Sequence, residues 1–297
     1  MRRATHKPVR VFLLATVVVL LATYSVFAEK QDSNLPANPN DLVRIAVQNE
    51  LKPPSGDAAE FHSWKTRQVK PNHTNVKLYV ETPDGLLARL LTVDDKPLSG
   101  EERAKEEDRI NRLLDPKQMQ QKRKQQNEDE SRTKRMVAAL PDAFIYQYTV
   151  TEEKNGHTLV NLKFAPNPKF NPPSREALVY QGMEGTMIID ATAMRMAKID
   201  GTMMKDVSIG WGIIGHLDKG GQFIVEQAEV DKGDWEITKM RLNFTGKALI
   251  FKSIKIDETD TSTDFHRVPK MTVAQALDFL KKADPQNGAV AEKENFK

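Results

Sequence analysis

The chain of 297 residues contains no cysteine. This absence excludes disulfide bonds, thiolate metal sites, cysteine nucleophiles and the lipidated cysteine that anchors a bacterial lipoprotein. A domain of this size does not need disulfides for stability, so an oxidising compartment is not excluded.

Motifs for catalysis and metal binding are also absent. The six histidines never pair at helical or ribbon spacing, and neither HExxH nor GxSxG occurs. Residues 210–215 (GWGIIG) match the glycine pattern of a dinucleotide site, but Gly220 and Gly221 leave no room for the helix that must follow. We therefore expect no catalytic residue, no metal and no cofactor. An envelope hydrolase built on a carboxylate pair is the least favoured of three hypotheses.

The chain has little excess charge once its first residues are set apart. The formal net charge is +3, and residues 1–28 carry four cations and no acid, so the remainder has a net charge of −1. A near-neutral chain gives no argument for nucleic-acid binding.

One long uncharged run lies at the N-terminus. Residues 1–10 are basic, residues 11–23 (VFLLATVVVLLAT) are apolar, and Val26 and Ala28 suit a signal-peptidase site. We expect a signal peptide over 1–28, cleavage after Ala28, export to the periplasm and no transmembrane segment after processing. The alternative is a retained anchor, for which 18 uncharged residues are barely long enough.

The mature chain divides into three parts. Residues 29–39 are polar with two prolines and predict a linker, and residues 284–297 predict a polar tail. Between them we expect one domain over 40–283. Asn40 can cap a helix over 41–51, and Thr272 with Gln275 can cap a C-terminal helix.

Short alternating segments predict strands throughout this domain. Turn signals separate them, such as Pro83-Asp84-Gly85 and Asn155-Gly156. Because the connections are too short for parallel crossovers, the sheet must be mostly antiparallel. The expected strands are 75–82, 86–93, 143–151, 157–164, 183–190, 194–204, 222–230, 235–245 and 247–257, with a turn at Thr245-Gly246.

A charged helical insertion over about 99–140 interrupts the strands. Ser99 with Glu102 is a capping-box pattern, and Asp115-Pro116 predicts the start of a second helix. From Lys117 to Arg135 the only large apolar residue is Met119. A helix that is polar all round cannot be buried, so we expect it to be solvated.

Several strands carry apolar residues on both faces. Met240, Leu242 and Phe244 alternate with Trp235 and Ile237 along one segment. Sheets with one solvated face alternate more cleanly, so both faces of this one need cover. Helices can cover one face, and the other needs a ligand or partner.

Several segments resemble a family of uncharacterised exported bacterial proteins. The resemblance is carried by LPDAF (140–144), FAPNPKFNPPSREA (164–177), EGTMIID (184–190), AKIDG (197–201), DVSIGWGIIGHLDKGGQF (206–223), GKALIFKSI (246–254) and DFHRVP (264–269). That family is distantly similar to the lipoprotein carrier and localisation superfamily, which includes LolA, LolB and the N-terminal domain of RseB. The resemblance implies an α+β fold, a large curved antiparallel sheet forming an incomplete barrel, with helices on one face and acyl chains held on the concave face.

Two hypotheses of different classes follow. The first is a non-enzymatic periplasmic protein that binds a lipid or a lipoprotein acyl chain in the curved sheet. The second is an envelope interaction or sensor scaffold that contacts a protein partner through the insertion. The residues expected to line an apolar groove are Met187, Ile189, Met194, Met196, Phe223, Trp235, Ile237 and Phe251.

Overall fold

The computed structural model describes residues 35–52, 61–209, 215–248 and 252–282. Several features expected from the sequence lie outside these ranges. They are the signal peptide with its cleavage site at Ala28, linker residues 29–34, most of the glycine pattern (210–214), Phe251 and the tail 284–297.

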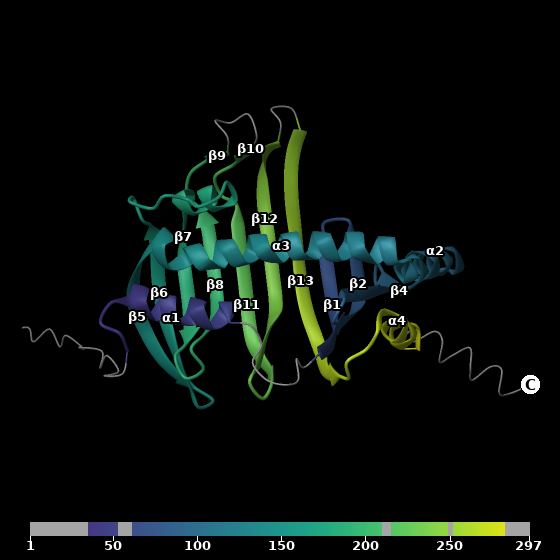
Figure 1. Ribbon diagram of the computed structural model, residues 1–297. Helices are drawn as coiled ribbons and strands as arrows, with labels where there is room; N and C mark the ends of the chain where they lie inside the picture. Colours follow the sequence, from purple (N-terminus) through teal and green to yellow (C-terminus); the bar gives the residue numbers. More distant parts are fainter. Residues whose placement is uncertain (1–34, 53–60, 210–214, 249–251, 283–297) are drawn as a thin grey trace, which may run out of the picture. The chain divides into compact units, whose positions relative to one another are not determined.

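The described part of the chain forms an antiparallel sheet of 13 strands that does not close (Figure 1). Its main order is β4-β3-β2-β1-β13-β12-β11-β8-β7-β6-β5, and β10 joins β9 to β12. The strands are β1 Phe61–Lys70, β2 His73–Thr82, β3 Gly85–Val93, β4 Lys96–Pro97, β5 Phe144–Lys154, β6 His157–Pro166, β7 Met183–Asp190, β8 Arg195–Met203, β9 Val207–Ile209, β10 Gly215–Leu217, β11 Gln222–Asp231, β12 Asp234–Ala248 and β13 Lys252–Val268. With the helices below, this confirms the α+β class and the curved antiparallel sheet.

The turn predicted at Asn155-Gly156 joins β5 and β6 in the structure. Asn155 and Gly156 both have positive φ, at 52° and 82°. A two-residue hairpin turn of this kind requires left-handed backbone at both positions, which asparagine and glycine tolerate best.

The expected turn at Thr245-Gly246 is wrong. β12 continues through Gly246, which pairs with Ile254 of β13. Glycine is needed there because a Cβ atom would collide with the backbone carbonyl of His216 on β10. The residue marks a close approach of two strands and not a change of direction.

The helices follow their capping residues. They are α1 Pro39–Leu51, α2 Gly100–Asn111, α3 Pro116–Ala143 and α4 Val273–Lys282, with 3-10 turns η1 Arg112–Leu114 and η2 Glu176–Gly182. Ser99 and Glu102 form the predicted capping box of α2, and Asp115 caps α3. None of the helices in the described ranges is both long and apolar enough to cross a membrane.

The N-cap of α1 differs from the prediction. Asn38 caps the helix and Pro39 occupies its first turn, so Asn40 lies inside it. Asn40 instead donates from Nδ2 to the carbonyls of Pro141 and Phe144, at 2.9 Å each. Its side chain thus ties α1 to the end of α3.

Two hydrophobic clusters stabilise the sheet from opposite faces. The first packs α1 and the end of α3 on β5–β8, with Leu42, Leu140 and Met187 at its centre. The second packs α4 on β2 and β3, with Leu78, Val80 and Leu277. Cross-strand partners share a face, and the register from β8 to β2 puts the second cluster on the opposite side. α1 and the C-terminal end of α3 cover the first face, and the second cluster also contains Ile110 of α2 and Met119 of α3.

The length of α3 shows how strongly the sheet curves. Gln126 donates to the carbonyl of Leu86 on β3 at 2.8 Å, and Ala143 leads directly into β5. Along the sheet these two strands are nine spacings apart, or about 43 Å at ~4.8 Å each. A helix rises only about 26 Å between those residues. The sheet must therefore bend into an arc, with α3 as a chord across its concave face (Figure 1).

Candidate binding surface on the concave face

Helix α3 is attached to the rest of the protein at its two ends. Towards its N-terminus, Met119 is buried in the second cluster and Gln126 bonds to β3. Towards its C-terminus, the carbonyl of Met136 accepts from the Tyr180 hydroxyl at 3.1 Å, and Leu140 is buried in the first cluster. These contacts fix the helix as a bridge between the two flanks of the sheet.

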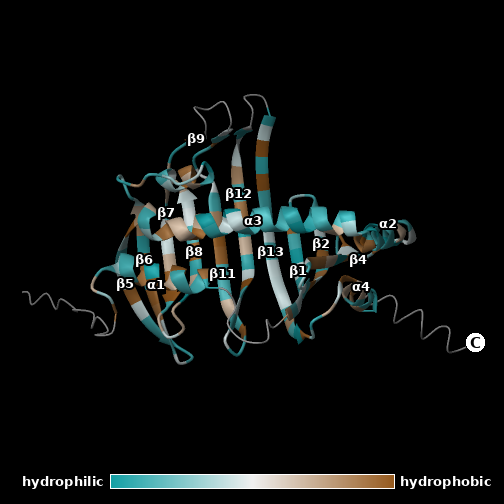
Figure 2. Ribbon diagram, viewed as in Figure 1, coloured by the Kyte–Doolittle hydropathy of each residue, from teal (hydrophilic) through white to brown (hydrophobic). Residues whose placement is uncertain are grey.

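The middle of α3, residues 127–135, is exposed on every side, and we call it the strap. Nine consecutive residues turn around a helix more than twice. A side that packed on the sheet would therefore contain buried positions, and none is buried. Figure 2 shows the strap as hydrophilic where it crosses the central strands. It bridges these strands without packing on them.

Beneath the strap, the central strands carry a continuous set of apolar side chains, which we call the apolar strip. In the strand register Phe223 faces Leu242, Val225 faces Met240, and Phe244 faces Ile256. Each is at least partly exposed. The strip consists of Phe223 and Val225 on β11, Met240, Leu242 and Phe244 on β12, and Ile254 and Ile256 on β13.

The strip lies on the same face as the first cluster. Val225 pairs with Ile199 of β8, which is buried in that cluster. Phe223, Val225 and Phe244 pack partly against the cluster's edge. The apolar surface therefore begins as core under α1 and becomes accessible on β11, β12 and β13, where Ile256 reaches 37% exposure.

The residues expected to line a groove are distributed differently. Met187, Ile189 and Met196 are 0%, 0% and 6% exposed and belong to the first cluster. Met194 sits in the turn before β8 with φ 52°, and its carbonyl accepts from Asn49 of α1 at 3.0 Å. Phe223 is the one member of the expected set that lies in the apolar strip.

Trp235 and Ile237 lie on β12 beyond a register irregularity between Glu226 and Gln227 of β11. Because a bulge interrupts the alternation of side chains between the two faces, the face of Trp235 and Ile237 cannot be counted from Met240. Ile237 is 47% exposed, and Trp235 is partly buried. Phe251 is outside the described residues.

The strip contains residues that were absent from the expected set, including Val225, Leu242 and Ile254. Their alternation with polar neighbours is visible in the sequence. What the sequence lacks is the strand order, which brings β11, β12 and β13 together under the strap and leaves β7 under α1.

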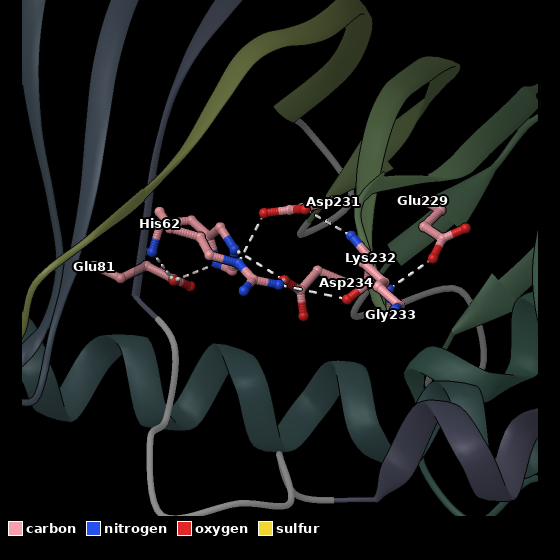
Figure 3. Close-up of polar contacts among 8 residues, drawn as sticks. His62, Glu81, Glu229, Asp231, Lys232, Gly233 and Asp234 are labelled. Carbon is pink, nitrogen blue, oxygen red and sulfur yellow. Dashed lines mark hydrogen bonds and ion pairs between the residues drawn. The ribbon is translucent and has the colours of Figure 1, made fainter.

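A polar cluster joins the β11–β12 hairpin to β1 and β2 (Figure 3). His62 is 5% exposed, with Nδ1 3.6 Å from Glu81 and Nε2 3.4 Å from Asp234. Arg267 bridges Asp231 and Asp234 at 2.8 and 2.7 Å. The guanidinium neutralises the hairpin carboxylates, and these contacts hold the β11–β12 hairpin against β1 and β13.

Glu236 lies beside this polar cluster, near Glu81, His62 and Asp234. Burial raises the pKa of Glu236 to about 7, and the neighbouring Glu81 carboxylate adds to the rise, while His62 and Arg195 oppose it. A carboxyl group in such surroundings is poised to change charge near neutral pH.

Metal chemistry has no support in the described ranges. No three side chains of His, Cys, Asp or Glu in them gather in a way that could hold an ion. The half-buried His157 lies 2.6 Å from the buried Asp190, which caps the turn after β7 and also accepts from the backbone N–H groups of Thr192 and Ala193.

No family model matches the sequence, and no curated protein matches it. Three solved structures are similar to the chain at low sequence identity. A LolA superfamily protein from Nitrosomonas europaea is 9% identical, with a TM-score of 0.28, over 80% of this chain and 96% of that chain. A DUF1329 family protein from Desulfovibrio piger is 11% identical, with a TM-score of 0.28, over 79% and 94%.

An outer membrane lipoprotein-sorting protein domain from Vibrio parahaemolyticus is 8% identical, with a TM-score of 0.26, over 77% of this chain and 93% of that chain. One of these structures is named for the superfamily that the sequence motifs resemble. Similarity at this level says nothing of a ligand, which has to be inferred from the chain's own residues.

Proposed function

We propose that this chain is a non-enzymatic binding protein of the periplasm, which holds the apolar part of a lipid or a lipoprotein acyl chain on the concave face of its sheet. The observation that carries the proposal is the pairing of a solvated strap with an apolar strip. Residues 127–135 are exposed on all sides, and the strip beneath them is only partly covered.

This arrangement calls for a ligand on physical grounds. Apolar surface in contact with water costs about 25 cal/mol per Å² relative to burial, and contiguous exposed apolar surface marks binding sites. A flexible acyl chain could lie along the strip, where Met240 offers an adaptable contact. The proposed lining is thus the apolar strip, with Trp235 and Ile237 beside it on β12.

The periplasmic location rests on the N-terminal segment. A basic start, an apolar run and small residues at 26 and 28 are the pattern of a secretory signal. Because the chain has no cysteine, it cannot carry a lipoprotein anchor of its own.

The alternative of a scaffold that binds a protein through the strap has less support. Arg132 lies 3.2 Å from Asp129 and 3.5 Å from Glu176, and Lys134 pairs with Glu130 at 2.6 Å. Ion pairs of this kind are typical of a solvated helix and leave little unbalanced charge for a partner.

A fluorescent fatty acid, cis-parinaric acid, tests the proposal by titration of the full secreted chain. Leu242→Gln combined with Phe244→Gln puts two amides on the strip and should weaken binding by at least about tenfold, from the lost apolar contact. Ile224→Gln is the matched control, because Ile224 pairs with Arg241 on the opposite face. It should change the affinity less than about twofold. Equal losses in both variants, or no binding by the unaltered chain, would contradict the proposal.

A further inference from the structure

One row of side chains runs sideways from the apolar strip. Met240, Asp260, Gln68 and Asn75 are direct cross-strand partners on β12, β13, β1 and β2. Direct partners point to the same face, so the row lies on the concave face. We call Asp260, Gln68 and Asn75 the polar row. The concave face therefore changes from apolar to polar within one strand spacing, about 5 Å.

The polar row is linked by long hydrogen bonds and is left short of donors. Gln68 Nε2 donates to Asp260 Oδ2 at 3.5 Å, and Asn75 Nδ2 donates to Gln68 Oε1 at 3.4 Å. Asn75 is only 7% exposed. Its Oδ1 and the Oδ1 of Asp260 are buried and have no hydrogen-bond partner among the described residues. A buried acceptor without a partner is costly, so this row can gain from an external donor.

The charges around Asp260 also favour binding of an external donor. Burial raises the pKa of Asp260, and the Glu258 carboxylate adds to the rise, although Gln68, Lys70 and Lys77 oppose it. Lys70 is engaged with Glu258 at 3.2 Å. The carboxylate of Asp260 is therefore stabilised less than it would be in water, and a cationic or hydroxyl donor would improve its surroundings.

We propose that the polar row binds the hydrogen-bond-donating head of an amphipathic ligand, an ammonium or a hydroxyl group, while the ligand's apolar tail lies on the apolar strip. The inference rests on the proposed function and adds the class of ligand to it. An amphiphile fits because the two surfaces adjoin at Met240 and Asp260. A ligand that offers only acceptors would leave both Oδ1 atoms unsatisfied.

Competition against bound cis-parinaric acid tests the inference with three phospholipids of identical acyl chains. Phosphatidylethanolamine offers an ammonium group, phosphatidylglycerol offers hydroxyl groups, and phosphatidylcholine has no hydrogen-bond donor in its head. At least one of the first two should compete at concentrations about tenfold lower than phosphatidylcholine. The better of the two tells whether the donor is an ammonium or a hydroxyl group.

Two near-isosteric variants test whether the preference for donor-bearing head groups arises from the polar row. Asp260→Asn and Asn75→Leu should each bring the three lipids to within about threefold of one another, with binding of phosphatidylcholine unchanged. Asp257→Asn is the control, because Asp257 pairs with Asn243 on the other face of the same strand. It should keep the full preference.

The outcomes separate the two proposals. Equal competition by all three lipids on the unaltered chain, or a preference that survives both variants, would overturn the polar row while leaving the proposed function standing. Absence of binding by the fatty acid and by every lipid would overturn the proposed function itself.

Discussion

Glu236 holds a carboxyl group in surroundings that disfavour its charge. Its pKa is raised from 4.5 to about 7, chiefly by burial and then by Glu81. The folded chain therefore binds a proton more tightly than the unfolded chain does. The stabilisation is fully present below pH 4.5 and is lost as the pH rises through about 7.

Glu236→Gln should remove this dependence. At pH 8 we expect the variant to be more stable than the unaltered chain by about 1–3 kcal/mol, and at pH 4 we expect equal free energies of unfolding. Urea unfolding followed by circular dichroism at both pH values measures the difference. Glu152→Gln, on the exposed end of β5, controls for loss of a charge. A variant that is less stable than the native chain at pH 8 would show that the carboxylate is needed in its charged form.

At this scale the sequence could not separate core residues from lining residues. Met187 and Ile189 alternate in an apolar strand just as Leu242 and Phe244 do. Only the packing of α1 over β7 makes the first pair core, with exposures of 0% each. That packing depends on contacts between residues more than a hundred positions apart, such as Asn40 with Pro141 and Phe144.

Among the elements, α3 matters most for the proposed function, because residues 127–135 in its middle are all exposed. Ser131 is exposed within the strap. Ser131→Ala should therefore raise stability by a few tenths of a kcal/mol, through helix propensity alone. Ser131→Pro should lower it by about 3 kcal/mol or more, because the helix is broken between its two anchors. Thermal unfolding by circular dichroism distinguishes them, and a destabilised alanine variant would mean that the strap packs on the sheet.

Most elements could be predicted from local signals. The caps at Ser99, Asp115 and Thr272 and the turn at Asn155-Gly156 depend on neighbouring residues only, and the structure has them. The wrong predictions occur where contacts with a segment distant in the sequence determine the local structure. The sequence around Gly246 predicts a turn, but the glycine accommodates the backbone of β10. The sequence around Asn40 predicts a helix cap, but its side chain bonds to the end of α3.

For the whole molecule, the decisive feature is that the path along the sheet from β3 to β5 is longer than the stretch of α3 that spans it. A sheet path of about 43 Å between β3 and β5 is bridged by about 26 Å of helix. The curvature that results separates the strap from β11, β12 and β13. Sequence patterns predicted the antiparallel sheet and the polar helix, but the strand order that sets the length of the arc comes only from the structure.

Native mass spectrometry of the chain purified from its own cell envelope tests the central claim most directly. We predict a mature chain that begins at Glu29 and carries an additional mass in the range of a lipid. The same preparation of the variant with Leu242→Gln and Phe244→Gln should be bare. A native chain that remains bare in repeated preparations, even after lipid is added, would contradict the claim that the concave face holds an apolar ligand.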